Sequence, residues 1–237
     1  ARNKDFDELY PPDFILEGKD QIRGWFNLLF VASMLTMNKP AYKAVYMHGF
    51  IMDALGRKQS KSLGNVISPY EVIDKYGADV LRYYMIGSSQ AGVDINYNFD
   101  DMKVRQRNLG ILWNLSKYLS DYAENLKMNP ANIRKPDLGT VEKYIMSKLH
   151  STIRTVTGLL DEYRLDEVPD RIEELFLTLS RTYIQLTRDK ASGAKQEQEQ
   201  HFYVVYHTLL NVVRMMAPII PFMSEQLYQN LKGFGLK

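Results

Sequence analysis

The segment FILEGKDQIRGWFNLLFVASMLTMNKPAYKAVYMH, residues 14–48, decides the fold class of the first part of the chain. It opens with a short apolar run that stops at Gly18, and it closes with a second run, residues 44–48, that stops at Gly49. Between these strand candidates, residues 20–37 form a helical stretch that is apolar nearly all round in its middle, which predicts a buried helix. Strand, buried helix and strand in this order are typical of a parallel sheet. Only about one such unit is present, so any doubly wound sheet is expected to be incomplete.

The pattern changes near residue 100, after which apolar residues recur every three or four positions, as on amphipathic helices. The repeats predict four long helices and a last short one: residues 104–126, 141–160, 168–186, 202–216 and 222–231. Breaks are expected at residues 129–136 and 191–200, and the second is polar enough to be mobile. The predicted fold class is therefore an α/β remnant of a Rossmann-like domain over residues 1–100, followed by an all-α helical bundle over 101–237, mainly α overall.

Composition excludes several classes of protein. The chain has 237 residues, 45% of them hydrophobic, which is enough apolar material for a sizeable core and excludes wholesale disorder. The absence of Cys excludes a disulfide scaffold, a thiolate metal site and a cysteine nucleophile within this stretch. A net charge of +2 gives no indication of binding to nucleic acid by bulk charge, although a local basic face remains possible.

No targeting or membrane segment is visible. The first residues are polar and charged, unlike a signal peptide. The most apolar run, residues 25–35, is far shorter than the ~20 residues that a membrane-spanning helix needs. A cytoplasmic protein is the default expectation.

The sharpest chemical signal is the loop GRKQSKSLGN, residues 56–65. Its two lysines, Lys58 and Lys61, alternate with two serines, Ser60 and Ser62, between glycines. Lysine places a compact, mobile charge on phosphate oxygens, and serine hydroxyls add neutral donors. Such a loop suits a polyphosphate and the negative charge that builds on a leaving pyrophosphate. On composition alone, a solvated surface loop is the alternative interpretation.

A second candidate site lies where the first strand ends and the following helix begins. Glu17, Asp20 and Gln21 supply hydrogen-bonding side chains around Gly18, which lets a ligand approach the backbone. In open α/β sheets, ligands collect at the carboxyl ends of the strands. The group suits an amine and a ribose, with Glu17 pairing with an ammonium. Asp20 has an equally simple alternative role as the cap of the following helix.

Two further residues near this site are ambiguous. Trp25 lies about one helical turn beyond Gln21, either as an ordinary core aromatic or as the wall of an apolar ligand pocket. His48 ends the second strand, where a lone histidine is more often structural. Without a second histidine nearby or any cysteine, a zinc site is not expected. No metal ligands are assigned.

Basic side chains recur in the helical part. They are Lys103, Arg105, Arg107, Arg181, Arg188 and Lys190. Solvated helix faces and phosphate contacts along a folded RNA both account for them.

Four stretches of this sequence resemble one enzyme family. The lysine loop resembles the KMSKS signature of class I aminoacyl-tRNA synthetases. The sequence usually found downstream of that signature is matched by Tyr76-Gly77-Ala78-Asp79-Val80-Leu81-Arg82. The block from Glu17 to Phe26, EGKDQIRGWF, looks like the form found in the isoleucine-specific branch. Residues 217–228, APIIPFMSEQLY, are similar to a stretch late in the family's anticodon-binding bundle. The resemblance spans nearly the whole chain.

The resemblance implies a ligase that uses ATP and Mg²⁺ to activate isoleucine as an adenylate and transfers it to tRNA(Ile) in protein biosynthesis. It assigns substrate or adenylate binding to Glu17, Gly18, Asp20, Gln21, Trp25 and His48. It assigns the catalytic loop to Lys58, Ser60, Lys61 and Ser62, with Lys61 gripping the ATP phosphates. It also implies that residues 1–100 are the C-terminal part of the catalytic domain and that residues 101–237 bind the tRNA anticodon arm.

The departures from the family pattern are equally informative. Gln59 replaces the usual Met of the loop, although both lysines and both serines remain. Residues 181–185 differ from the sequence common in isoleucine-specific enzymes. This difference puts in doubt the tRNA contacts expected from the helix predicted over residues 168–186. No His-x-Gly-His signature occurs, so the N-terminal catalytic half and the editing domain are expected to be missing. We therefore expect this stretch alone to be inactive.

Three alternatives remain open from the sequence. The first is a sister synthetase for leucine, valine or methionine, which shares the lysine loop. The second is a non-catalytic tRNA-binding module that uses only the helical bundle. The third is a helical scaffold for protein interactions, which would bind no RNA.

Overall fold

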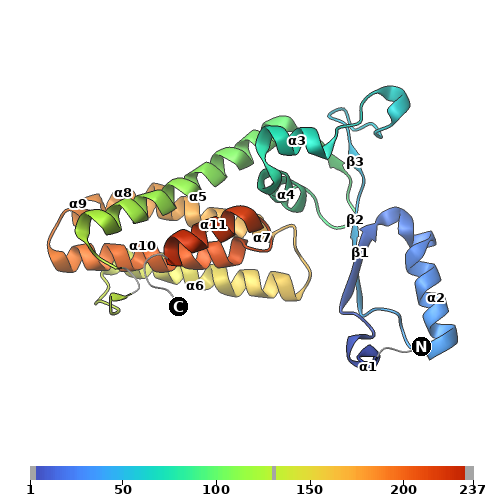
Figure 1. Cartoon of the computed structure of the whole chain (residues 1–237), viewed down its shortest axis with the longest axis horizontal. Coiled ribbons are helices and arrows are strands. Elements are labelled where there is room, and N and C mark those ends of the chain that lie inside the picture. The colour runs from blue at the N-terminus through green and yellow to red at the C-terminus, as the bar shows by residue number, and fades with distance from the viewer. Residues whose placement is uncertain (1–3, 130–131, 233–237) are drawn as a thin grey trace. The chain divides into compact units, whose positions relative to one another are not determined.

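The computed structural model describes residues 4–129 and 132–232, so Pro130 and Ala131 of the first predicted break lie outside the described residues. The chain forms two compact units. One comprises residues up to Ile67 together with Ser88–Asn98, and the other comprises Ser68–Gly87 together with the chain from Phe99 onward. The architecture is mainly helical with few short strands, as predicted (Figure 1).

The first unit contains the predicted strand–helix–strand. β1 (Phe14–Gly18) and β2 (Ala44–His48) pair in parallel, with α2 (Trp25–Met37) between them in the sequence. The prediction of a parallel pair is confirmed. The remaining elements of this unit are short: α1 (Phe6–Leu9), the 3₁₀ turns η1 (Lys19–Arg23) and η2 (Lys61–Leu63), and a second parallel pair, β3 (Ile51–Met52) with β4 (Ile95–Asn96).

The helix between the two strands differs from the prediction in two ways. It does not begin at residue 20, because the 3₁₀ turn η1 and Gly24 precede the α-helix. It is also not buried, since Phe26 and Ser33 are its only buried residues while Leu35 is 81% exposed. A helix that is apolar all round needs neighbours on every side. The β1–β2 sheet of the described residues has two strands, which are too few to provide them.

The second unit is the predicted helical bundle. Its helices are α3 (Pro69–Tyr76), α4 (Ala78–Gly87), α5 (Phe99–Leu126), α6 (Thr140–Asp161), α7 (Val168–Thr178), α8 (Ile184–Leu186), α9 (Arg188–Ala191), α10 (Lys195–Met216) and α11 (Pro221–Lys232). α10 is its central element, because it packs against α5, α6, α7 and α11. Its buried side chains include Phe202, Val205, Leu209, Val212 and Met216. These are the apolar positions that the helical spacing singles out.

Two boundaries in the bundle differ from the prediction. The helix expected over residues 168–186 is interrupted by the π-helical segment η4 (Leu179–Tyr183). The polar break expected at 191–200 is shorter, because α10 already begins at Lys195. Glu197 accepts a hydrogen bond from the backbone N–H of Ala194 at 3.1 Å, which stabilises the new helix start although the residues around it are polar.

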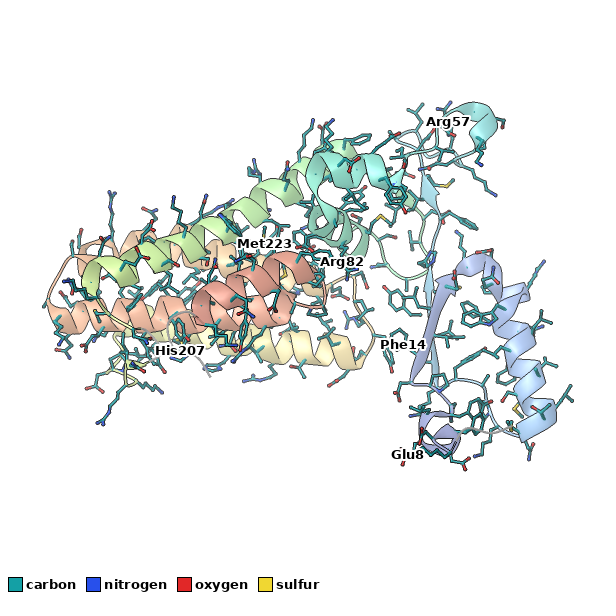
Figure 2. All side chains as sticks on the ribbon, viewed as in Figure 1. Glu8, Phe14, Arg57, Arg82, His207 and Met223 are labelled. Carbon is teal, nitrogen blue, oxygen red and sulfur yellow. The ribbon has the colours of Figure 1, made fainter. Side chains whose placement is uncertain are left out.

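Two side chains of α4 join residues 68–87 to the rest of the bundle. One of them, Arg82, is labelled in Figure 2. Arg82 donates to the carbonyl oxygens of Pro218 and Ile219, each at 2.9 Å. Asp79 accepts from the backbone N–H groups of Phe222 and Met223, at 3.4 and 2.6 Å, and so caps α11. Two of the four family-like stretches, residues 76–82 and 217–228, therefore bind each other. The domain division expected at residue 100 stays a prediction.

A buried polar cluster lies inside the bundle. The imidazole of His201, which is fully buried, lies 2.8 Å from the hydroxyl of Tyr118 and 2.9 Å from that of Thr187. Nearby, the ammonium of Lys190 donates to the fully buried carboxylate of Glu142 at 2.9 Å. Burial lowers the pKa of His201 to about 4, while Glu142 raises it and Lys190 lowers it by smaller amounts.

Candidate active site

The carboxyl ends of β1 and β2 lie side by side, which brings the first predicted site together. Glu17 is in register with Met47, and Gly18 with His48. The carboxylate of Glu17 lies 3.9 Å from Nε2 of His48, and both side chains are about half exposed. Parallel strands present their ends to a ligand in this way. The pair leaves an accessible carboxylate beside a histidine at the edge of the sheet.

A side chain at Gly18 would meet two neighbouring side chains. A Cβ at this position would lie 2.5 Å from the carboxylate oxygen of Asp20 and 3.4 Å from the imidazole of His48. Gln21 donates to Asp20 at 2.9 Å and also accepts from the backbone N–H of Trp25 at 3.1 Å. The residue that satisfies the start of α2 is therefore Gln21, whereas the alternative derived from the sequence gave this role to Asp20.

Trp25 stands at the first position of α2 and is 42% exposed, with its ring 5.7 Å from that of Phe26. An apolar pocket of about 460 Å³ lies close to this helix. Its lining residues among those described are Ile22, Phe26, Asn27, Phe30, Tyr42, Val45 and Met47. Trp25 is not one of them, so its role as the wall of a ligand pocket stays a prediction.

The lysine loop is organised around Asp53, which sequence reasoning did not assign to the site. One oxygen of Asp53 accepts from the N–H groups of Leu55 and Arg57 at 3.0 and 2.9 Å. The other accepts from the side chains of Asn65, at 2.9 Å, and Arg57, at 2.8 Å. The bond from Asn65 and those from Arg57 hold the pKa of Asp53 well below its ordinary value. Asp53 is thus a carboxylate that binds four donors.

Asn65 extends this network to the lysine loop itself. Its carbonyl oxygen accepts from the N–H of Ser60 at 2.9 Å, and its amide donates to the backbone oxygen of Lys58 at 3.3 Å. The hydroxyl of Ser60 lies 3.1 Å from that of Ser62, and it accepts from the N–H of Leu63 at 3.3 Å. The four predicted loop residues therefore lie in one tight turn. The side chain of Lys61 is exposed and forms no ion pair within the described part of the chain.

Gln59, which stands where the family usually has Met, faces inward. Its carbonyl oxygen accepts from the N–H of Ile67 at 3.2 Å. Its amide nitrogen is buried and has no hydrogen-bond partner among the described residues. Such an unpaired donor costs free energy that an apolar side chain of similar size does not.

The ring of Phe50 connects the two predicted sites. The ammonium of Lys58 lies 5.6 Å from the centre of this ring, and that of Lys19 lies 5.2 Å from the same centre. Lys19 also donates to Asp94 at 2.6 Å, and Asp94 accepts from the backbone N–H of Phe50 at 2.7 Å. The first lysine of the loop and the block that begins at Glu17 therefore meet at one aromatic side chain.

Comparisons with known proteins identify two domains in this chain. Residues 1–98 match the family described as tRNA synthetases class I (I, L, M and V), and residues 142–236 match the anticodon-binding domain of tRNA ligase. The chain belongs to the class I aminoacyl-tRNA synthetases. It is 38% identical over 233 residues to an isoleucine–tRNA ligase of Methanosarcina barkeri, a match that covers 95% of this chain and 22% of that protein. A Methanoculleus marisnigri isoleucine–tRNA ligase is 36% identical over 247 residues, covering 97% and 23%.

This synthetase chain thus spans about a fifth of the length of the curated relatives it matches. Solved structures agree on the fold. A Mycobacterium tuberculosis methionyl-tRNA synthetase in complex with methionyl-adenylate has a TM-score of 0.80 at 18% identity, covering 95% of this chain and 45% of that one. An Agrobacterium radiobacter leucyl-tRNA synthetase in a ternary complex with tRNA has a TM-score of 0.72 at 21% identity, covering 94% and 28%.

Within residues 4–129 and 132–232, no three or more His, Asp or Glu side chains gather closely enough to hold an ion. The same residues contain no helix that is both long and apolar enough to cross a membrane.

Lys19, Phe50, Asp53, Asn65 and Asp94 are the residues of this site that sequence reasoning left without a role. Lys19 and Asn65 lie inside the family-like stretches, which is a usable signal. Asp94 lies 44 residues from Phe50, to which it is hydrogen-bonded, and no local pattern marks it.

Proposed function

We propose that this chain is part of an isoleucine–tRNA ligase, with ATP, isoleucine and tRNA(Ile) as the substrates of the whole protein. In the first step the isoleucine carboxylate attacks the α-phosphate of ATP, a phosphoanhydride bond breaks, and isoleucyl-adenylate and pyrophosphate form. In the second step a ribose hydroxyl of the tRNA end displaces AMP. The observation that carries the proposal is the meeting of the Lys58 loop and the Glu17 block at Phe50.

The proposed roles follow from charge and position. The accessible carboxylate of Glu17 suits the ammonium of isoleucine or of its adenylate, and His48 stands beside it. Gly18, Asp20 and Gln21 surround the amine and the ribose, and the backbone approach at Gly18 leaves room for a ligand. Trp25 lines the pocket for the isoleucine side chain in this proposal. A pocket alone discriminates a missing methylene by only about 1–3 kcal/mol, isoleucine-specific synthetases being a standard example, so the whole protein is expected to carry an editing activity.

The lysine loop would stabilise the leaving pyrophosphate. The ammonium groups of Lys58 and Lys61 neutralise phosphate oxygens, and the hydroxyls of Ser60 and Ser62 donate to them. Such preorganised charge at a developing anion supplies much of the acceleration in phosphoryl chemistry, and no covalent nucleophile is needed. Mg²⁺ enters this proposal as the counter-ion of ATP.

The rest of the protein completes the site in this proposal. Helix α2 leaves apolar side chains exposed, including Leu28, Val31 and Leu35. We expect the missing half of the nucleotide-binding domain to cover them, because relatives are more than four times as long as this chain. The bundle from residue 101 onward would hold the tRNA anticodon arm, and the protein would act in the cytoplasm. The chain alone would activate no amino acid.

The test is pyrophosphate exchange by the full-length protein with a Lys61→Ala substitution. Loss of one preorganised charge contact of this kind typically lowers kcat by about 10²–10³-fold. Lys39→Ala, which removes an exposed lysine of the same unit, is the matched control and should stay within about twofold of wild type. An unchanged exchange rate in Lys61→Ala would overturn the assignment of the loop.

Two further measurements distinguish the remaining alternatives. Exchange measured with isoleucine, leucine, valine and methionine identifies the branch of the family. In the isoleucine enzyme, Trp25→Ala should raise the KM for isoleucine more than the KM for ATP, and equal effects would discard the pocket role. A protein that binds tRNA with steep salt dependence but exchanges no pyrophosphate with any of the four would be a non-catalytic module.

A further inference from the structure

Two side chains at the base of the lysine loop form a junction, defined here as Asp53 and Asn65. They lie 12 residues apart in the sequence and are joined by a hydrogen bond of 2.9 Å from the amide of Asn65 to the carboxylate of Asp53. Asp53 is buried, with 9% of its side chain exposed. A buried carboxylate needs partners for its lone pairs, and here every one of its four donors comes from residues 55–65. The hydrogen bonds of Asp53 therefore hold the backbone and side chains of the lysine loop.

Asp53 is anchored on the sheet side of the loop. It directly follows β3, whose residue Met52 accepts from the N–H of Tyr97 and forms an isolated antiparallel bridge with Lys58. The N–H of Asp53 donates to the carbonyl oxygen of Arg57 at 2.9 Å, which closes the turn before the loop. The carboxylate thus stands on a defined strand end.

Asn65 connects Asp53 to the backbone that bears the two lysines. Through Lys58 and Ser60 it holds the backbone on both sides of Gln59, and Lys61 is the next residue along the chain. A lysine side chain is flexible, so its reach is set by the backbone from which it starts. Without the junction, Lys58 and Lys61 would start from a loop with many conformations, and each would have to be ordered when ATP binds.

We propose that Asp53 and Asn65 are positioning residues, which hold the lysine loop in the backbone arrangement that delivers Lys58 and Lys61 to the phosphates of ATP. This inference rests on the proposed function and names two residues outside the KMSKS-like segment Lys58–Ser62, although Asn65 ends the wider loop stretch of residues 56–65. Neither side chain contacts substrate in the proposal, and both act through the loop.

Asp53→Asn is the sharpest variant because it is isosteric. One of its two acceptor oxygens becomes a donor, so either the N–H groups of Leu55 and Arg57 or the side chains of Arg57 and Asn65 lose their acceptor. Asn65→Ala removes the same junction from the other side. In the full-length protein we expect each to lower the kcat of pyrophosphate exchange at least tenfold and to leave the KM for isoleucine within about twofold. The double variant should lose less than the two single losses combined, because the two side chains share the hydrogen bond between Asn65 and Asp53.

A matched control separates positioning from general stability. Asp13→Asn removes an exposed carboxylate of the same unit that binds Lys43 at 2.6 Å, and it should keep the wild-type exchange rate. Limited digestion with trypsin gives a direct readout of the loop, and cleavage after Lys58 or Lys61 should be faster in Asp53→Asn than in wild type. Asn65→Ala provides the same readouts if Asp53→Asn fails to fold.

The outcomes distinguish this inference from the proposed function. If Lys61→Ala abolishes exchange while both junction variants keep the wild-type rate, the positioning role is wrong and the loop assignment stands. Additive losses in the double variant, or an equal rise in the KM for isoleucine, would also overturn the positioning role. If Lys61→Ala itself changes nothing, the proposed function fails first.

Discussion

His201 should make the stability of the helical bundle depend on pH, and the size of the effect follows from its burial. The imidazole is fully buried, and desolvation lowers its pKa from 6.5 to about 4. The unfolded chain therefore binds a proton between these two pH values that the folded chain does not. At about 1.4 kcal/mol per pH unit, this difference corresponds to about 3 kcal/mol.

The sign follows from linkage. Because the folded pKa is depressed, the full contribution is present above pH 6.5 and is lost progressively as the pH falls towards 4. His201→Gln removes the titrating group, and its amide can still bond the hydroxyls of Tyr118 and Thr187. Between pH 7 and pH 4, the wild-type chain should lose about 3 kcal/mol more free energy of unfolding than this variant.

Urea unfolding followed by far-UV circular dichroism measures this difference, because most of the helix lies in this unit. His207, whose pKa burial also lowers, is present in both chains and cancels. Tyr118→Phe is the control: it removes one hydrogen bond and costs about 1 kcal/mol, yet it should keep the wild-type pH dependence because burial is the main cause. Parallel curves for wild type and His201→Gln would refute the reasoning.

Two further predictions concern single contacts. Asp79→Ala removes the cap of α11 and should lower the free energy of unfolding by about 1 kcal/mol in urea titrations, and an unchanged midpoint would contradict the capping role. Gly49→Ala should lower the melting temperature markedly, because its Cβ would lie 2.1 Å from the carbonyl oxygen of Val93 and the backbone there must move; a wild-type melting temperature would show that the close approach is absent.

The elements of this chain were predictable where a pattern is local. The strands at residues 14–18 and 44–48 are short apolar runs bounded by glycine, and the long helices repeat every three to four residues. The features that the sequence did not predict have no local pattern. The helix start at Lys195 and the π-helical interruption at Leu179–Tyr183 depend on packing and on single hydrogen bonds, which hydrophobic spacing does not report.

The candidate site divides in the same way. Lys58, Lys61 and Glu17 were accessible to sequence reasoning, because residue type and spacing carry their chemistry. The approach of Lys58 and Lys19 to the ring of Phe50 was not, since it depends on how the folded chain places the loop beside the block that begins at Glu17.

The sequence by itself determined the α/β-then-helical order of the chain, the family to which it belongs and the residues able to carry charge to a phosphate. The tertiary structure alone decided that α2 is exposed, that Asp53 and Asn65 organise the lysine loop, and that Asp94 is hydrogen-bonded to Phe50. The physical reason is the distance along the sequence over which each interaction acts. Helical and strand periodicity act over a few residues, whereas desolvation and hydrogen bonding of a buried carboxylate depend on neighbours that only the folded chain brings together.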